Sequence, residues 1–188
     1  GSYTLEETLG LAFRIGEVAA RLEGVMLHGH WPEGQLGRLP VYVSSHNFRV
    51  EGGRHVTVSG YGDQMEAFHQ AHPEFVRMPL VHPWHHPDYA RFAHQLPPIP
   101  SRPVRDAVFV SGVTGRCETS LSDDYWRRWL TSPIDFIAAM QAVRSRVGDN
   151  AVEIVEIGFH PVLEACGRIF RRHDYASSMH RGEDDLEW

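Results

Sequence analysis

Two neighbouring segments alternate apolar and polar residues, and this pattern constrains the fold more than any other in the chain. They are VYVSSHNFRV, residues 41–50, and HVTVSG, residues 55–60. Such alternation is typical of strands with one buried face, and the EGG between them suits a tight turn. The sequence therefore predicts a β-hairpin. A short helix over 63–72 and a strand over 75–81 follow, which together make most of a small α+β lobe.

An amphipathic helix is predicted ahead of this lobe, from Thr4 to Glu23. Its apolar residues recur at spacings of three and four, which places them on one stripe of a helix. Thr4 and Glu7 have the spacing of a capping box, in which a hydroxyl and a carboxylate satisfy free backbone N–H groups. The glycine- and proline-rich residues 28–40 are expected to form a loop.

A different pattern follows the proline-rich residues 97–103. Strand-like and helical segments alternate there, which suggests a parallel, doubly wound sheet. The expected strands cover 106–115, 151–158 and 174–179. The expected helices cover 89–96, 123–130, 133–147 and 161–170, with Pro133 at a first helical position.

Composition argues against several classes of function. The 188 residues are 42% hydrophobic and 22% charged, so the chain can bury a core. The net charge is −6 without a basic stripe, which disfavours nucleic acid as a partner. No apolar run approaches the roughly 18 residues of a membrane span, and the first residues do not resemble a signal peptide. Cys117 and Cys166 are expected to be free thiols in a reducing cytoplasm.

Three of the 13 histidines lie close together in PLVHPWHHPDY, residues 79–89. The spacing of His82, His85 and His86 leaves a metal site conceivable, although prolines interrupt any helix that would align the rings. A base for a serine or cysteine nucleophile is an alternative. The sequence contains no G-x-S-x-G nucleophile elbow and no G-x-x-x-x-G-K phosphate motif. These residues alone leave metal site, catalytic base and surface decoration open.

Several short motifs follow one another in a characteristic order. They are VTVSG (56–60), PLVHPWHHPDY (79–89), VSGVTG (110–115), YWRRWLTSPIDF (125–136) and VEIGFHPVL (155–163). They resemble, in register, V-V-V-S-G, P-V-x-H-A-F-H-S-P-x-M, S-T-V-T-G, Y-W-x-x-N-L-x-x-P-V-x-F and V-E-V-G-P-H-P-V-L. By these motifs the chain resembles the acyltransferase domain of modular polyketide synthases, which is similar to malonyl-CoA:carrier-protein transacylases.

The resemblance implies an α/β fold with two lobes. Residues 1–23 and 82–188 would form the C-terminal part of a hydrolase-like parallel-sheet lobe, and residues 24–81 an inserted ferredoxin-like α+β lobe. The family's G-H-S-x-G segment precedes the first helix, so the large lobe is expected to be incomplete. Its exposed apolar surface would then be covered by a partner, such as an N-terminal acyltransferase segment or another synthase domain.

The resemblance also implies a reaction. His85 matches the general base that activates a serine, which takes an acyl group from CoA and passes it to the phosphopantetheine thiol of an acyl carrier protein. Acyl-CoA and carrier protein would be the substrates, with no metal and no bound cofactor. The carbonyl that orients His85 is implied in the loop 156–160, where His160 is expected to be structural. His86 is expected to be an ordinary surface residue.

Three residues are candidates for binding the acyl group. Pro83 and Trp84 precede the base, and Trp84 stands where the family has a residue linked to acyl selection. Malonyl-type members carry an arginine on the first helix that pairs with the free carboxylate, and Ile15 stands at that point. Arg14 is one residue earlier, a rotation of about 100° on a helix. The acyl group is therefore expected to be uncharged, as in starter-unit enzymes.

Two rival functions remain open from the sequence. One is an acyl-thioester hydrolase of the same fold, which would use water as the second acceptor. The other is a non-catalytic, histidine-rich fragment that binds a metal or docks on a partner.

Overall fold

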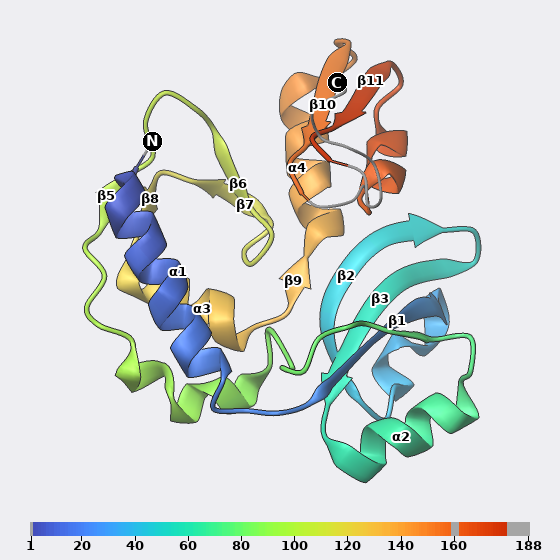
Figure 1. The fold of residues 1–188 in the computed structure, drawn as a ribbon. Coiled ribbons are helices and arrows are strands. Elements are labelled where there is room, and N and C mark those ends of the chain that lie inside the picture. The colour runs from blue at the N-terminus through green and yellow to red at the C-terminus, as the bar shows by residue number, and fades with distance from the viewer. Residues whose placement is uncertain (1, 159–161, 180–188) are drawn as a thin grey trace.

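The computed structural model describes residues 2–158 and 162–179, and within them helices and strands form a mixed α/β fold (Figure 1). The α-helices are α1 Leu5–Ala19, α2 Gly62–Ala71, α3 Asp123–Thr131 and α4 Phe136–Val147. The 3-10 helices are η1 Glu33–Arg38, η2 Pro87–Arg91, η3 Ala93–Gln95 and η4 Glu164–Ile169. The longer strands are β1 Val25–Pro32, β2 Tyr42–Val50, β3 Gly53–Gly60, β10 Val152–Glu156 and β11 His173–Ser177. The short strands are β4 Val76–Arg77, β5 Arg102–Pro103, β6 Phe109–Ser111, β7 Arg116–Glu118, β8 Ser120–Leu121 and β9 Ile134–Asp135.

The predicted hairpin forms the middle of the largest described sheet, whose strand order is β4-β1-β3-β2-β9. β2 and β3 pair antiparallel, and Gly52 in the turn has φ 75°, which explains a glycine there. β9 pairs parallel with β2 through Ser45 and Ile134. The sheet of the small lobe thus continues into a segment beyond residue 82, which the predicted division did not include. The boundaries at 23, 24, 81 and 82 stay a prediction.

One face of this sheet is apolar because alternate residues of β1 and β3 point to the same side. Leu27, Val56 and Val58 are fully buried on that side. They pack in one core with residues of α2 and the segment after it, namely Met65, Phe68 and Phe75. Residues 28–40 were expected to be a loop, but most of them belong to β1 and η1. Strand pairing with β3 and β4 overrides the weak local signal of a Gly- and Pro-rich segment.

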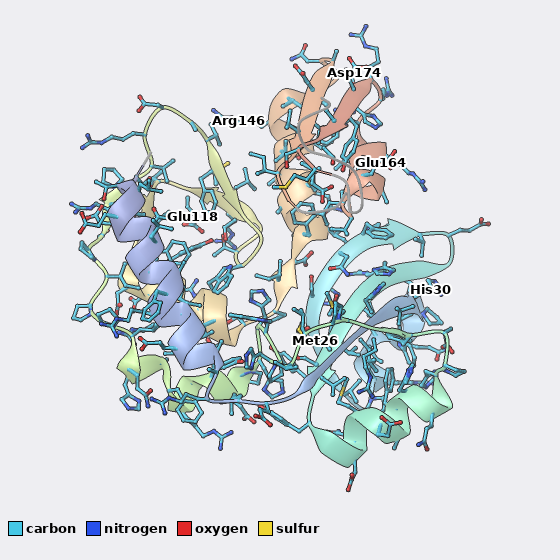
Figure 2. All side chains as sticks on the ribbon, viewed as in Figure 1. Met26, His30, Glu118, Arg146, Glu164 and Asp174 are labelled. Atoms are coloured by element: carbon cyan, nitrogen blue, oxygen red, sulfur yellow. The ribbon has the colours of Figure 1, made fainter. Side chains whose placement is uncertain are left out.

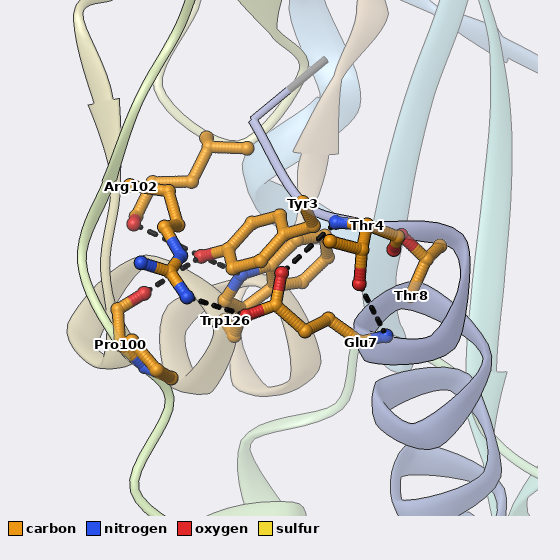
Figure 3. A network of polar contacts seen from close by, with 8 residues as sticks. Tyr3, Thr4, Glu7, Thr8, Pro100, Arg102 and Trp126 are labelled. Carbon is orange, nitrogen blue, oxygen red and sulfur yellow. Dashed lines mark hydrogen bonds and ion pairs between the residues drawn. The ribbon is translucent and has the colours of Figure 1, made fainter.

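A hydrogen-bond network connects the start of α1 to β5 and α3 (Figure 3). The predicted capping box forms, with Glu7 N–H donating to Thr4 Oγ1 and Thr4 N–H to the Glu7 carboxylate. The hydrogen bond from the Thr4 backbone N–H and a pair with Arg102 on β5 together lower the pKa of the Glu7 carboxyl. Tyr3 accepts a hydrogen bond from the indole of Trp126 on α3. The network therefore fixes α1 relative to α3.

The large lobe differs from the sequence expectation in several elements. Residues 89–96 form the 3-10 helices η2 and η3, and 161–170 becomes η4, which begins at Glu164. Only Phe109–Ser111 of the strand expected over 106–115 is extended, as half of a hairpin with β7. Pro133 does not begin α4, because β9 intervenes and the Asp135 side chain caps the helix.

The expected parallel sheet is represented, in the described parts of the chain, by the pair β10 and β11. These strands lie beside α4, at the top of Figure 1. No helix of the described residues has the length and apolar character needed to cross a membrane.

Candidate active site

His85 lies just before η2, and its imidazole is held against α3. Its Nδ1 is 2.8 Å from the backbone carbonyl oxygen of Trp129. The ring also meets the Trp129 indole edge-on, with ring centroids 4.8 Å apart. The His85 backbone has φ 57°, in the left-handed region that few residues other than glycine and asparagine adopt. A hydrogen bond, a ring contact and an uncommon backbone conformation together fix the position of the His85 imidazole.

The packing of α3 against the η2–η3 segment brings these residues together. Arg127 on α3 pairs with Asp123 and donates to the carbonyl oxygen of Leu96. Leu130 on α3 and Tyr89 on η2 are fully buried in the same core. This packing fixes α3 relative to η2. The Trp129 backbone carbonyl therefore reaches the His85 ring, and the hydrogen bond that orients the ring does not involve a second side chain.

The hydrogen bond to Trp129 selects the protonation form of His85. A carbonyl only accepts, so Nδ1 carries the hydrogen and, in the neutral ring, Nε2 keeps a free lone pair. Burial lowers the pKa of His85 below its usual 6.5, against the opposing effect of the Trp129 hydrogen bond. The ring is therefore neutral at pH 7, with Nε2 able to accept a proton. This is the form that a general base requires.

His85 lines a cavity of about 330 Å³, which we call the base cavity. Met26 on β1, labelled in Figure 2, and Ser45 on β2 line it from the sheet. Ile134 on β9 lines it from the same sheet, and Trp84 lines it beside His85. The base cavity thus lies between the sheet and the segment that carries His85.

A second cavity of about 580 Å³, the tryptophan cavity, lies between α1 and α3. Trp84 lines both cavities, so the two adjoin at that ring. The tryptophan cavity is lined by Ser2, Tyr3, Thr8, Leu11, Ala12, Ile15, Trp84, Leu121, Trp126 and Trp129. This set contains three indole rings and no charged side chain.

The structure brings two of the three predicted acyl-binding residues into this tryptophan cavity. Ile15 is 7% exposed and lines it with Trp84. Arg14 does not line it, is exposed and pairs with Glu17 at 2.7 Å. Pro83 lines neither cavity. It is fully buried beside Gly24, where a Cβ would lie 2.9 Å from the proline ring. Pro83 therefore packs the chain locally, and its predicted contact with substrate finds no support.

The neighbouring histidines have separate partners. His82 Nδ1 donates to the carbonyl oxygen of Leu22 at 2.9 Å. His86 accepts a hydrogen bond from the backbone N–H of Asp88, and its ring packs edge-on against Tyr42 and Tyr61. The prediction of an ordinary surface residue is wrong for His86, since its side chain is only 12% exposed. Within 2–158 and 162–179, no group of three His, Cys, Asp or Glu side chains could hold a metal.

The carbonyl that orients His85 is not the predicted one. The prediction placed it in the loop 156–160, whereas the structure gives Trp129 that role. His160 itself lies outside the described residues. Sequence reasoning missed Trp129, although YWRRW puts a tryptophan where the resembled motif Y-W-x-x-N has asparagine. That departure concerns the side chain, so it gave no signal that the backbone carbonyl at this position is the partner of His85.

Comparison with solved structures gives the class of fold. The acyltransferase domain from module 8 of the salinomycin polyketide synthase matches with a TM-score of 0.81 and 18% identity, over 97% of this chain and 47% of that one. Malonyl-CoA–acyl carrier protein transacylase from Clostridium perfringens matches with a TM-score of 0.73 and 16% identity, over 100% and 64%. The acyltransferase domain of phenolphthiocerol/phthiocerol synthase A from Mycobacterium bovis (BCG) gives 0.77 and 16%, over 96% and 76%.

The chain therefore has the fold of polyketide synthase acyltransferase domains and of malonyl-CoA–acyl carrier protein transacylase, as the sequence motifs indicated. It spans about half the length of the salinomycin synthase domains that it matches. No family model and no curated protein matches the sequence.

Proposed function

We propose that this chain supplies the general base and the acyl-binding wall of an acyltransferase that loads an acyl carrier protein. The observation that carries the proposal is the 2.8 Å hydrogen bond from His85 Nδ1 to the Trp129 carbonyl. It leaves Nε2 unprotonated on a ring that lines a cavity. The fold shared with carrier-protein acyltransferases supports the same assignment.

The nucleophile in this proposal is a serine on residues outside this sequence, because the sequence has no G-x-S-x-G motif. His85 Nε2 takes the serine proton as Oγ attacks the thioester carbonyl carbon of acyl-CoA. The tetrahedral intermediate collapses, the C–S bond breaks, and CoA leaves as a thiol with the proton from His85. The carrier thiol then gives its proton to His85, attacks the acyl-serine ester, and the serine oxygen recovers the proton.

The tryptophan cavity supports an uncharged acyl group. Ile15 and Trp84 line it, and none of its lining side chains is an arginine or lysine. A carboxylate buried there without a cation would be unfavourable by several kcal/mol. Alkyl and aryl groups gain instead from contact with indole rings. We therefore propose a monocarboxylic acyl group, such as butyryl or benzoyl.

Mass analysis of a carrier protein tests this proposal. The protein, together with the polypeptide that carries the serine, is incubated with holo-carrier protein and butyryl-, benzoyl- or malonyl-CoA. We expect mass shifts of the carrier with butyryl and benzoyl, and little with malonyl. A clear preference for malonyl-CoA would contradict the proposed acyl group. Release of free acid without loading of the carrier would favour the hydrolase.

A further inference from the structure

The face of the sheet opposite α2 is polar and lines a further cavity. The register places His28 on β1 opposite Thr57 on β3, so the two side chains share this face. The cavity, which we call the histidine cavity, has a volume of about 390 Å³. It is lined by His28, Asn47, Phe48, His55, Thr57, Met78, Val162 and Leu163. Asn47, Thr57, Met78 and Leu163 also line the base cavity, so the two adjoin.

The polar groups of this face form one chain of hydrogen bonds. Ser45 Oγ donates to Asn47 Oδ1 at 2.6 Å. The Asn47 amide nitrogen donates to Thr57 Oγ1 at 3.0 Å and faces His55 Nδ1 at 3.1 Å. His55 Nε2 in turn lies 3.2 Å from His28 Nδ1. The chain therefore connects Ser45, which lines the base cavity, to His28, which lines the histidine cavity.

The order of these bonds fixes where the hydrogens lie. The amide of Asn47 donates to His55 Nδ1, so a neutral His55 carries its hydrogen on Nε2 and donates it to His28 Nδ1. His28 must then carry its own hydrogen on Nε2. Both rings are neutral at pH 7, because burial and the adjacent histidines lower the pKa of His55 to about 4, and burial lowers that of His28.

Among the contacts within residues 2–158 and 162–179, two hydrogen-bond donors at this cavity have no acceptor. Thr57 accepts from Asn47 and keeps its own hydroxyl hydrogen, while His28 keeps Nε2–H. Both are donors without charge, and they suit an oxygen that only accepts. The cations of the same hairpin, Arg49 and Arg54, are bound by Glu33. A neutral carbonyl oxygen fits this arrangement better than a carboxylate, which would lack a cation here.

We propose that His28 Nε2–H and the Thr57 hydroxyl bind a carbonyl oxygen of the acyl thioester substrate. The proposal rests on the proposed function, since the ligand is a thioester that reaches His85 through the base cavity. The oxygen has two possible sources with the same chemistry. One is a keto group on the acyl chain, and the other is an amide carbonyl of the phosphopantetheine arm.

Calorimetric binding of two probes tests the proposal without turnover. Butyryl-pantetheine and 3-oxobutyryl-pantetheine differ by one keto group, and both contain the amides. The variants are His28→Phe, which removes the donor, and the near-isosteric Thr57→Val. His94→Phe is the control, because His94 is exposed on η3 and lines none of the three cavities.

We expect each variant to weaken binding about three- to tenfold, as the loss of one neutral hydrogen bond does. A loss confined to the 3-oxobutyryl probe assigns the acyl keto group. An equal loss for both probes excludes the keto group and assigns a carbonyl common to both, which is a pantetheine amide when the thioester carbonyl lies at His85. Unchanged affinity of both variants for both probes, or no binding by the wild type, overturns the proposal. Thr57→Val keeps the test valid if His28→Phe does not fold. Binding without acyl transfer would separate failure of the proposed function from failure of this inference.

Discussion

His85 and Trp129 meet twice, once through a hydrogen bond and once through their rings. Nδ1–H of His85 donates to the Trp129 backbone carbonyl, and the indole packs edge-on against the imidazole. In the first contact Trp129 uses its backbone carbonyl, and in the second it uses its side chain. The two contributions can therefore be separated by mutation, because a substitution at Trp129 removes the indole and keeps the carbonyl.

Trp129→Phe is expected to change substrate binding and leave the base intact. The indole lines the tryptophan cavity, so its loss should raise KM for butyryl-CoA about three- to tenfold, equivalent to roughly 1 kcal/mol. The pH profile of kcat/KM should keep its shape, since the Trp129 carbonyl still orients His85. Steady-state kinetics between pH 5 and 8 measures both. If the acidic limb of the kcat/KM profile moves to a different pH in this variant, the Trp129 indole, and not its carbonyl alone, holds the His85 imidazole.

Ile15→Arg is expected to shift acyl preference toward carboxylated groups. An arginine in the tryptophan cavity could pair with a carboxylate, which should raise the malonyl-to-butyryl ratio of kcat/KM about tenfold or more. The change buries a charge in the free protein, so thermal unfolding should show a loss of stability.

Arg14→Gln is the matched control for this change, because Arg14 is exposed on the same helix and does not line the tryptophan cavity. It should leave the ratio unchanged. An equal shift in both variants would contradict the role of Ile15. If Ile15→Arg does not fold, Ile15→Ala enlarges the cavity and should favour benzoyl over butyryl.

The buried histidine pair makes stability depend on pH. The pKa of His55 is about 4 in the folded protein and near 6.5 when exposed, so the unfolded chain binds more protons between these values. The contribution of the buried neutral His55 to the free energy of unfolding is therefore fully present above pH 6.5, and it is lost as the pH falls toward 4. Urea unfolding at pH 7, 5.5 and 4 measures the effect. His55→Phe should lose less stability than the wild type over this range, and parallel profiles would contradict the expectation.

Sequence patterns predicted the parts of the fold that depend on local chemistry. The capping box of Thr4 and Glu7 and the hairpin of β2 and β3 formed as expected, because each is set by residues close in sequence. β1 was missed because the second half of VMLHGHWP belongs to the glycine- and proline-rich residues 28–40, whose local pattern is typical of a loop. Its strand conformation depends on pairing with β3 and β4, which local propensity does not contain.

The candidate site was predictable only in part for the same reason. His85 and Ile15 were both singled out by their positions in the resembled motifs, and each lines a cavity of the structure. The partner of His85 is a backbone carbonyl 44 residues away, and a carbonyl is present at every residue. Nothing in the residue type of Trp129 indicates that its carbonyl is the one used. The chain of hydrogen bonds from Ser45 to His28 likewise requires the register of three strands.

The rate of butyryl transfer to a carrier protein by the His85→Asn variant tests the central claim most directly. Asparagine tolerates the left-handed backbone at this position, so the variant should fold. His94→Asn, at an exposed position on η3, serves as the control. We predict that the His85 variant binds butyryl-CoA normally and transfers it about 10²- to 10⁴-fold more slowly, as loss of a general base does. Transfer at the wild-type rate by a folded His85→Asn protein would contradict the assignment.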